Sequence, residues 1–331
     1  MNFKRGRLVV LLFLVSATLA AAATIKEVKL TLGRDDHNKI GSPVVDTSKV
    51  GVLGIETLVA SYDPKAKIVR RGGGGGFMFG APNYDLDKTI NMAALLTDAL
   101  RSEAPAMGFR LASAGGEPAW EIKGTLKDIY AESRQVYMGS TLFYGFMDVE
   151  LQVRPPGGEA RTERLRAHSF YGAYNAGAGR KDEAQEALAH LLVEGAQEIL
   201  ARLNRTHFKA PPHPDIEKKI NALTSATRND ILVVGLSGNS LAVPALLKLL
   251  PQTEDENVRE AMIEALARIG SPEAVAGLAA RYASEDEDCR WAILKAMDYI
   301  GGQEAMTVVR EKGSIDENGP CKSLAKRLGS S

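Results

Sequence analysis

The sequence predicts two folded parts: an α+β domain, with an antiparallel sheet and two helices on one face, followed by an all-α array of helical repeats. Three observations support this fold class. Apolar and polar residues alternate along 118–175, as in strands that bury one face. An amphipathic helical pattern lies on each side of that stretch. After residue 215 the sequence repeats with a period of 31 residues, and a chain of 331 residues is long for one core.

The chain begins with the pattern of a secretory signal peptide. Three basic residues precede an apolar run that starts at Leu8 and ends in three alanines at 21–23, which fit an A-x-A cleavage site. The run is 16 residues long, shorter than the roughly 20 residues that span a bilayer. We therefore expect residues 1–23 to be removed, with Thr24 as the first residue of the mature protein.

The predicted mature protein is close to neutral, because the chain has 41 basic and 41 acidic residues and three of the basic ones lie in the signal peptide. This balance argues against general nucleic-acid binding, which uses a basic face. No cysteine directly follows the apolar run, so a lipidated N-terminus is not expected, and no later apolar run is long enough to cross a bilayer. We expect a periplasmic or secreted protein, exported by a Sec-type signal.

The α+β domain is predicted for residues that follow the signal peptide. Two short strands at 24–32 and 48–55 precede the first helix, whose expected N-cap is Asp85 or Asp87. The three antiparallel strands of the central stretch come next, and a second helix follows at 182–203. A sheet with one buried and one solvent-exposed face needs helices over its buried face, so both helices are expected there.

The order of four segments in this domain resembles a known family. A strand V-G-V-L-G-I at 50–55, an Arg-Gly-Gly loop, a helix that ends in M-G-F-R at 107–110 and the strand G-T-L-K-D-I-Y-A-E at 124–132 follow one another. This order is similar to that of the YajG-like family of small bacterial envelope lipoproteins, over residues 24–204. The resemblance implies a small envelope domain without an active site. The sequence departs from the family in lacking the lipidated cysteine, which argues against direct anchoring in the outer membrane.

A glycine-rich segment of unusual composition lies between the second strand and the first helix. It has two arginines, Arg70 and Arg71, then five consecutive glycines centred on Gly74, then the aromatic residues Phe77 and Phe79. Phosphate-binding loops need a helix directly after the glycines and a Lys-Ser/Thr pair or a spaced glycine motif, and this segment has neither. We expect a flexible loop whose aromatic tip docks on a partner or tucks under the sheet.

A proline-rich linker at 205–214 separates the two parts, and the helical array is predicted for 215–331. The dipeptide Ile-Gly at 269–270 recurs 31 residues later at 300–301. The segments V-R-E-A and A-L-A-R-I-G within 258–270 resemble the short HEAT repeat, which implies an α-solenoid of paired helices. Two clear repeats are predicted, with a degenerate repeat at each end. Gly319 and Pro320 are expected to disrupt the last helix.

The second helix of each repeat is expected to present a ridge of side chains to partners. The candidate interaction surface consists of Glu260, Glu264, Arg268, Trp291, Lys295 and Asp298. Trp291 is either a core residue or an interface anchor. Arg259 and Arg290 recur at one repeat position, and bonds to the turn acids Asp255 and Asp286 are favoured over ligand contacts.

The sequence shows no recognisable set of catalytic, cofactor-binding or metal-ligating residues. The five histidines are scattered without metal-site spacing, and no cysteine has a neighbouring histidine. Cys289 and Cys321 are the only cysteines. In an exported protein they could form a disulfide, and two buried free thiols are the alternative.

We therefore expect an exported, non-catalytic protein that acts as an interaction or scaffolding module of the bacterial envelope, with another envelope protein as its partner. A periplasmic carrier or sensor of an apolar or peptide ligand is an alternative, with the glycine-rich segment as the gate of its pocket. A hydrolase whose site residues meet only in the fold is a second alternative.

Overall fold

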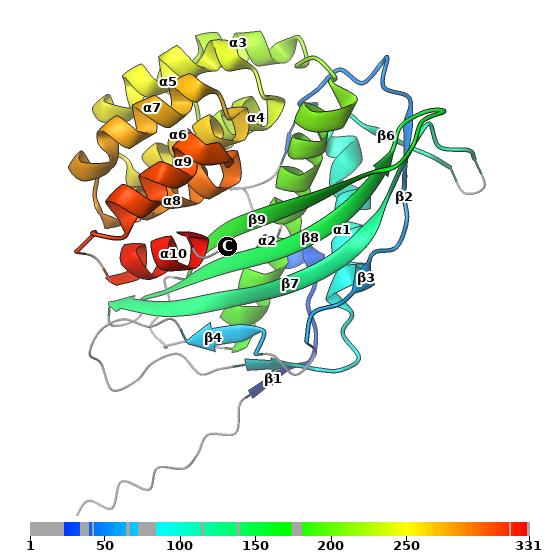
Figure 1. Cartoon of the computed structure of the whole chain (residues 1–331), viewed down its shortest axis with the longest axis horizontal. Coiled ribbons are helices and arrows are strands. Elements are labelled where there is room, and N and C mark those ends of the chain that lie inside the picture. Colours follow the sequence, from blue (N-terminus) through cyan, green and yellow to red (C-terminus); the bar gives the residue numbers. More distant parts are fainter. Residues whose placement is uncertain are drawn as a thin grey trace, which may run out of the picture.

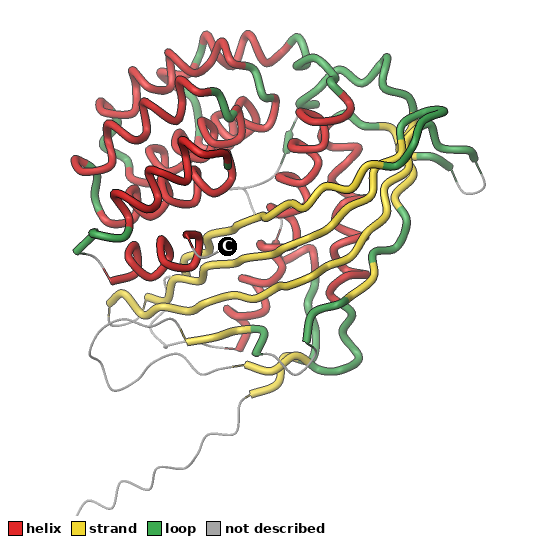
Figure 2. The backbone as a smooth tube through the Cα atoms, viewed as in Figure 1, coloured by secondary structure: helices red, strands yellow, loops and turns green. Residues whose placement is uncertain are grey.

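The computed structural model describes residues 23–33, 40–41, 43–63, 67–71, 84–113, 116–137, 140–173, 181–317 and 319–329. Within them a long curved sheet lies over two helices, and a block of shorter helices lies beyond one edge of that sheet (Figure 1). Figure 2 shows the same division, with the strands in the N-terminal part and only helices and loops in the C-terminal part. Residues 1–22 of the predicted signal peptide and the segment 72–80 of the glycine-rich loop lie outside the described residues.

Three long antiparallel strands form the body of the sheet. They are β7 Trp120–Tyr137, β8 Ser140–Arg154 and β9 Arg161–Ala173, and β8 lies between the other two. Their buried positions alternate along each strand, as the sequence predicts for a sheet with one buried face. On the exposed side, charged residues pair across the strands, for example Arg154 with Glu121 at 2.9 Å.

A β-bulge in β7 explains why the alternation in the sequence stops before the end of the strand. The register against β8 shifts between Leu126 and Asp128. Ile122 and Leu126 are buried before the bulge, whereas Ile129 and Ala131 are buried after it. The positions that join the apolar core therefore change from even to odd numbers, because the extra residue turns the following side chains over. The alternation in the sequence thus breaks at the bulge, although β7 continues beyond it as one strand.

The side of β7 that does not face β8 pairs with short parallel strands. The sheet is therefore mixed, and the expectation of a purely antiparallel sheet was wrong. These strands are β2 Val52–Ile55, β3 Val59–Ala60 and β4 Val69–Arg71. A helix lies between them and β7 in the sequence, and a crossover of this kind brings the chain back in parallel. The remaining short strands are β1 Ala23–Ile25, β5 Tyr84–Leu86 and β6 Arg110–Leu111.

Two long helices cover the buried face of the sheet, α1 Met92–Met107 and α2 Lys181–Leu203. The N-cap of α1 is Asn91, whose side chain accepts hydrogen bonds at 3.1 Å from two backbone N–H groups of the first turn. The predicted caps Asp85 and Asp87 lie too early in the chain, because that segment forms β5 and a turn before the helix begins.

Small residues let α2 lie close to the sheet. A Cβ added at Gly145 of β8 would lie 2.9 Å from Leu191 Cδ1, and one at Gly195 of α2 would lie 2.5 Å from Met147 Cε. These distances are shorter than van der Waals contact, so a Cβ at either position would require Leu191 or the flexible end of Met147 to shift. Leu191 is fully buried, and the helix and strands share one apolar core.

The predicted linker is held against the α+β domain. α2 continues as one π-helical turn, Asn204–Phe208. The backbone N–H of Asp46 then donates to the Pro211 carbonyl at 2.8 Å, and the backbone N–H of His213 donates to the Val44 carbonyl at 3.0 Å. The segment after α2 is therefore fixed at several points before the helical part begins.

The helical part is built from successive helix pairs, as the repeat pattern predicts. The helices are α3 Asp215–Asn221, α4 Arg228–Ser237, α5 Val243–Leu249, α6 Glu256–Ile269, α7 Pro272–Arg281, α8 Glu287–Ile300, α9 Gly302–Val308 and α10 Gly319–Gly329. The second members α4, α6 and α8 pack side by side, and a Cβ added at Gly235 would lie 2.5 Å from Ala265 Cα. Gly319 and Pro320 begin α10 and do not disrupt it, since proline fits the first turn of a helix.

Arginine side chains join each of two repeats to the following turn. Arg259 forms ion pairs with Glu285, at 3.4 Å, and with Asp286. Arg290 Nε lies 3.0 Å from Asp316 Oδ2. The structural role expected for the two arginines fits these contacts, but each arginine reaches the acids of the next repeat and so bridges neighbouring units.

The α+β domain and the helical part share apolar packing at α3 and α4. Ile216, Val233 and Leu236 belong to the buried cluster of the α+β domain. Ile231 and Val234, on the same helix as Val233, belong to the buried cluster of the helical part. α4 is therefore packed into both cores, and the contact between the two parts is apolar at this point. Among the described residues, no helix combines the length and apolar character needed to cross a bilayer.

Candidate functional site

The candidate interaction residues lie on α6 and α8, around the contact that these helices make with α2 and β9 of the same chain. The buried ones, with exposed fractions of 5–8%, are Glu260, Arg268, Lys295 and Asp298. Glu264 and Trp291 are half-buried, and the Lys295 ammonium lies 4.9 Å from the centre of the Trp291 ring. Arg268 and Asp298 thus lie in a junction within the chain, in contact with α2 and β9, whereas Trp291 packs against the buried cluster of the helical part.

Asp298 on α8 binds two side chains of β9. Its Oδ2 lies 2.7 Å from His168 Nε2, and its Oδ1 accepts a hydrogen bond from Arg166 Nη1 at 3.0 Å. Burial acts to raise the pKa of Asp298, but His168 and Arg166 outweigh it and hold the pKa below its usual value. Asp298 is therefore an ionised carboxylate that ties the last long helix of the repeats to the edge strand of the sheet.

Glu198 on α2 connects β9 with α6. Its Oε2 accepts a hydrogen bond from the backbone N–H of His168 at 3.1 Å. Its Oε1 lies 3.5 Å from Arg268 Nη2, and both side chains are at least nine-tenths buried. Burial raises the pKa of Glu198, although the neighbouring Arg268 and His168 act against this rise.

A second glutamate on α2, Glu194, lies beside Glu264 of α6. Burial and the charge of Glu264 raise the pKa of Glu194 to about 8, despite the nearby cations Arg228, Arg268 and Lys295. For Glu264, burial also acts to raise the pKa, but Lys295 and the two arginines hold it below its usual value. Lys295 Nζ lies 3.7 Å from Glu264 Oε1. Burial and the neighbouring Glu264 thus favour the protonated form of Glu194, whereas the surrounding cations favour the ionised form of Glu264.

The C-terminal end of α2 contacts the end of α8 through Tyr299. Arg202 Nη1 donates to the Tyr299 carbonyl at 2.8 Å, and the Tyr299 hydroxyl donates to the Glu198 carbonyl at 3.3 Å. The guanidinium groups of Arg202 and Arg205 lie 5.5 and 5.7 Å from the centre of the Tyr299 ring. Gly270 leaves room for Arg205, because a Cβ there would lie 1.8 Å from its Nη1.

A small cavity lies within this cluster. It is lined by His168, Glu198, Glu264, Ala267, Arg268, Ala292, Lys295, Ala296 and Tyr299. Its volume of about 20 Å³ suits a single water molecule. Arg268 Nε and Nη1 are buried without a hydrogen-bond partner, which a water in this cavity would supply. Small-molecule pockets are larger, about 300 Å³ or more, so this cavity is too small for such a ligand.

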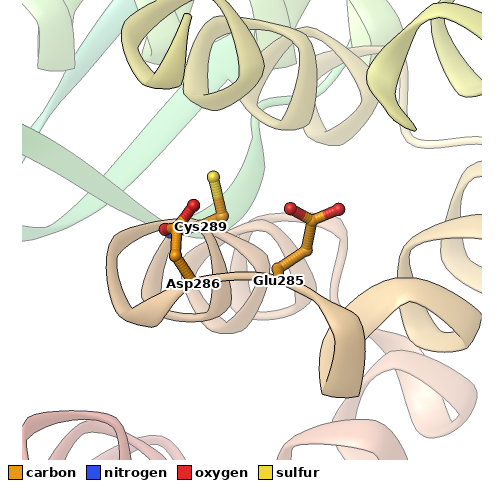
Figure 3. Close-up of side chains that lie close together, drawn as sticks. All are labelled: Glu285, Asp286 and Cys289. Carbon is orange, nitrogen blue, oxygen red and sulfur yellow. The ribbon is translucent and has the colours of Figure 1, made fainter. Parts of the chain in front are cut away.

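A separate group of potential metal ligands lies where α8 begins. One ligand atom each from Glu285, Asp286 and Cys289 lies within 4.8 Å of the others (Figure 3). Arg259 pairs with both carboxylates, Arg281 Nε lies 2.7 Å from Glu285 Oε1, and burial raises the pKa of the Cys289 thiol. Metal binding needs an ionised thiolate and free carboxylates. We therefore interpret this group as part of the turn that links two repeats.

The remaining candidate residues of the sequence analysis are the two cysteines and the residues of the predicted flexible loop. Cys289 and Cys321 are buried free thiols, so the disulfide that the sequence allowed is not formed. Arg70 and Arg71 contribute their backbones to β4, next to Glu132 and Ser133 of β7. The other residues of the predicted flexible loop, Gly74, Phe77 and Phe79, lie outside the described residues.

Sequence reasoning missed the half of this junction that the α+β domain provides. On the sequence pattern, Glu194 and Glu198 fall on the polar face of the second helix, and Arg166 and His168 on the polar face of a strand, where solvent exposure is the ordinary expectation. A usable signal was present, because glutamates one turn apart on α2 complement the basic residues on the predicted ridge. Pattern alone does not distinguish such a face from one that points to solvent.

Comparisons with known proteins support the helical half. A family model described as HEAT repeats matches residues 213–298, which include α3 to α7 and nearly all of α8. This match confirms that part of the predicted repeats. No curated protein matches the chain.

Solved structures of low similarity were also found. Protein XCC0632 from Xanthomonas campestris, of family DUF330, has 10% identity and a TM-score of 0.31, covering 54% of this chain and 93% of its own. A minor lipoprotein from Acinetobacter baumannii has 14% identity and a TM-score of 0.25, covering 47% of this chain and 96% of its own. Both TM-scores are too low to carry an argument, so the similarity of residues 24–204 to the YajG-like family stays a prediction.

Proposed function

We propose that this chain is an exported, non-catalytic protein of the bacterial cell envelope that binds another envelope protein through a short solenoid of HEAT repeats. One observation carries the proposal: α6 and α8 already bind a folded protein surface, namely α2 and β9, through Asp298 and Arg268. Repeat arrays recognise partners with such extended helix faces.

The partner is expected on the first helices of the repeats, because the α+β domain already contacts the second helices α6 and α8. Exposed side chains of these helices include Lys248 on α5, Glu273 on α7 and Glu304 on α9. Glu273 and Glu304 are 31 residues apart and so occupy the same place in successive repeats. A row of equivalent exposed positions is the kind of surface that a solenoid offers to a partner.

Site-specific photo-crosslinking in cells tests this proposal. A photoreactive amino acid is placed at Lys248, Glu273 or Glu304 of the tagged full-length protein, and adducts are identified by mass spectrometry after denaturing capture. The matched control positions are Gln152 and Thr162, which are exposed on the sheet. We expect adducts with one recurrent envelope protein from the helix positions and none from the sheet positions. Equal adducts from both sets, or none above the untagged control, would overturn the proposal.

Export is supported by the basic and apolar pattern of the N-terminal residues. The expected product begins at Thr24 and is found in the periplasmic fraction or the medium. N-terminal sequencing of the protein purified from fractionated cells measures both properties. An intact N-terminus in the cytoplasmic fraction would contradict export and leave the binding proposal to be judged by the crosslinking result.

A further inference from the structure

The polar contacts between the α+β domain and the repeats fall into two classes of distance. At Asp298 they are direct, because its carboxylate lies 2.7 Å from His168 Nε2 and accepts a hydrogen bond from Arg166 Nη1 at 3.0 Å. At the small cavity the pair is wider. Arg268 Nη2 lies 3.5 Å from Glu198 Oε1, which is longer than the roughly 2.7–3.2 Å of an N–H···O hydrogen bond. These two helix contacts therefore differ in kind.

Glu264 shows the same wide spacing. Lys295 Nζ lies 3.7 Å from its Oε1, and Arg228 Nη2 lies 3.9 Å from its Oε2. Polar groups separated by more than about 3.5 Å leave room for a water molecule that bonds to both. Glu264 and Lys295 line the cavity together with Glu198 and Arg268, so the wide pairs surround one common space.

The guanidinium group of Arg268 provides a second, independent observation. The side chain is 4% exposed, and its Nε and Nη1 have no hydrogen-bond partner among the residues that the structure describes. Buried N–H groups are satisfied in native proteins by protein atoms or by ordered water, because an unmet donor costs free energy. Arg268 lines the cavity, so an acceptor placed there lies beside its unmet donors.

We propose that this cavity binds one water molecule that joins the two parts of the chain, accepting a hydrogen bond from Arg268 of α6 and donating one to the Glu198 carboxyl group of α2. The cavity volume of about 20 Å³ is sufficient for one water and too small for a larger ligand. Its polar lining supplies the two to four partners that a buried water needs. The inference concerns the junction within the chain and does not depend on the proposed envelope partner.

The side chains around the cavity favour a neutral ligand over an ion. Two of them are basic, Arg268 and Lys295, and two are acidic, Glu198 and Glu264. A halide ion would accept from Arg268 but has no proton to donate to either carboxyl group, whereas a metal cation would lie beside two basic groups. Water both accepts and donates hydrogen bonds, so it matches the whole lining.

A crystal structure of the purified full-length protein, at a resolution that shows ordered water, tests the site directly. We expect one solvent peak within about 3.2 Å of a nitrogen of Arg268 and of a carboxyl oxygen of Glu198. A bromide soak distinguishes water from a halide, since an anomalous peak in the cavity would identify an anion and overturn the proposal. A cavity without a solvent peak, with Arg268 bonded directly to a protein acceptor, would overturn it as well.

Two substitutions of similar shape test the same site in solution. Ala296 lines the cavity from α8, and both Ala296→Val and Ala296→Thr fill space that the water occupies. Only threonine brings a hydroxyl group that can accept from Arg268 in place of the water. We therefore expect the unfolding equilibrium constant, measured by urea unfolding, to be about tenfold higher for Ala296→Val than for Ala296→Thr.

The same pair of substitutions at Ala305 is the control. Ala305 of α9 is fully buried in the apolar cluster of the helical part and does not line the cavity. In an apolar site the hydroxyl group is the costlier one to bury, so Ala305→Thr is expected to be less stable than Ala305→Val. If valine is also the milder substitution at Ala296, or if the two are equal there, no hydrogen-bonding ligand occupies the cavity and the proposal fails.

Discussion

The two sides of α2 make different kinds of contact. Toward the sheet, α2 presents Leu191 and Gly195, which pack against β8 at van der Waals distance. Toward the repeats, it presents Glu194 and Glu198, which are buried among cations of α4, α6 and α8. Apolar burial is favourable in any orientation, whereas a buried charge is tolerated only with its partner in place. One helix thus builds a permanent core on one side and a specific, separable contact on the other.

The largest expected effect comes from breaking the charged side. Arg268→Ala leaves Glu198 and Glu264 buried with one cation fewer. We expect it to lower the free energy of unfolding by about 3–5 kcal/mol, the usual cost of stranding a buried charge. Urea unfolding followed by circular dichroism measures this change.

The matched double variant shows whether the pair itself stabilises the fold. Arg268→Met combined with Glu198→Leu replaces the pair by apolar side chains, and we expect it to recover most of the loss caused by Arg268→Ala. A double variant as unstable as Arg268→Ala would mean that the ionic contact contributes net stability, and the comparison between the two sides of α2 would then fail.

The apolar side is tested by Leu191→Ala. Leu191 is fully buried and lies over Gly145, so its truncation leaves a cavity between α2 and β8. We expect a loss of about 2–5 kcal/mol in the free energy of unfolding. The loss is expected to be the same at pH 6 and pH 9, because no titrating group contributes to it. A difference between the two pH values larger than about 1 kcal/mol would show that the two sides of α2 are not independent.

The contrast also explains what the sequence could predict. Periodic apolar residues predicted the central strands, α2 and the paired helices, since burial of apolar side chains follows the period of each element. The bulge between Leu126 and Asp128 hid the second half of β7, because it shifts the period by one residue. The parallel pairing of β2, β3 and β4 was missed since the period of a strand does not depend on the direction of its neighbour.

The sequence singled out only part of the candidate site. The ridge residues Arg268, Lys295 and Asp298 lie on α6 and α8, the second helices of their pairs. Their partners Glu194 and His168 were not found, because a charged residue on a helix or strand face has the same pattern whether it meets water or another domain. Only the fold shows that the domain preceding the repeats covers this ridge.

The smallest expected effect concerns the start of α4, the helix that both cores share. Thr227 Oγ1 accepts a hydrogen bond from the backbone N–H of Asp230 at 3.2 Å, and the Asp230 carboxylate accepts one from the backbone N–H of Thr227 at 3.3 Å. This capping box satisfies amides that the helix leaves free. Thr227→Ala is expected to lower the free energy of unfolding by about 1 kcal/mol.

Thr307→Ala on α9 is the control for Thr227→Ala, because the Thr307 hydroxyl bonds to a carbonyl within its own helix and caps nothing. We expect its effect to stay within about 0.5 kcal/mol. Thr227→Ala is therefore expected to shift the urea midpoint more than Thr307→Ala does. Equal shifts from the two variants would mean that the capping box at the start of α4 contributes no measurable stability.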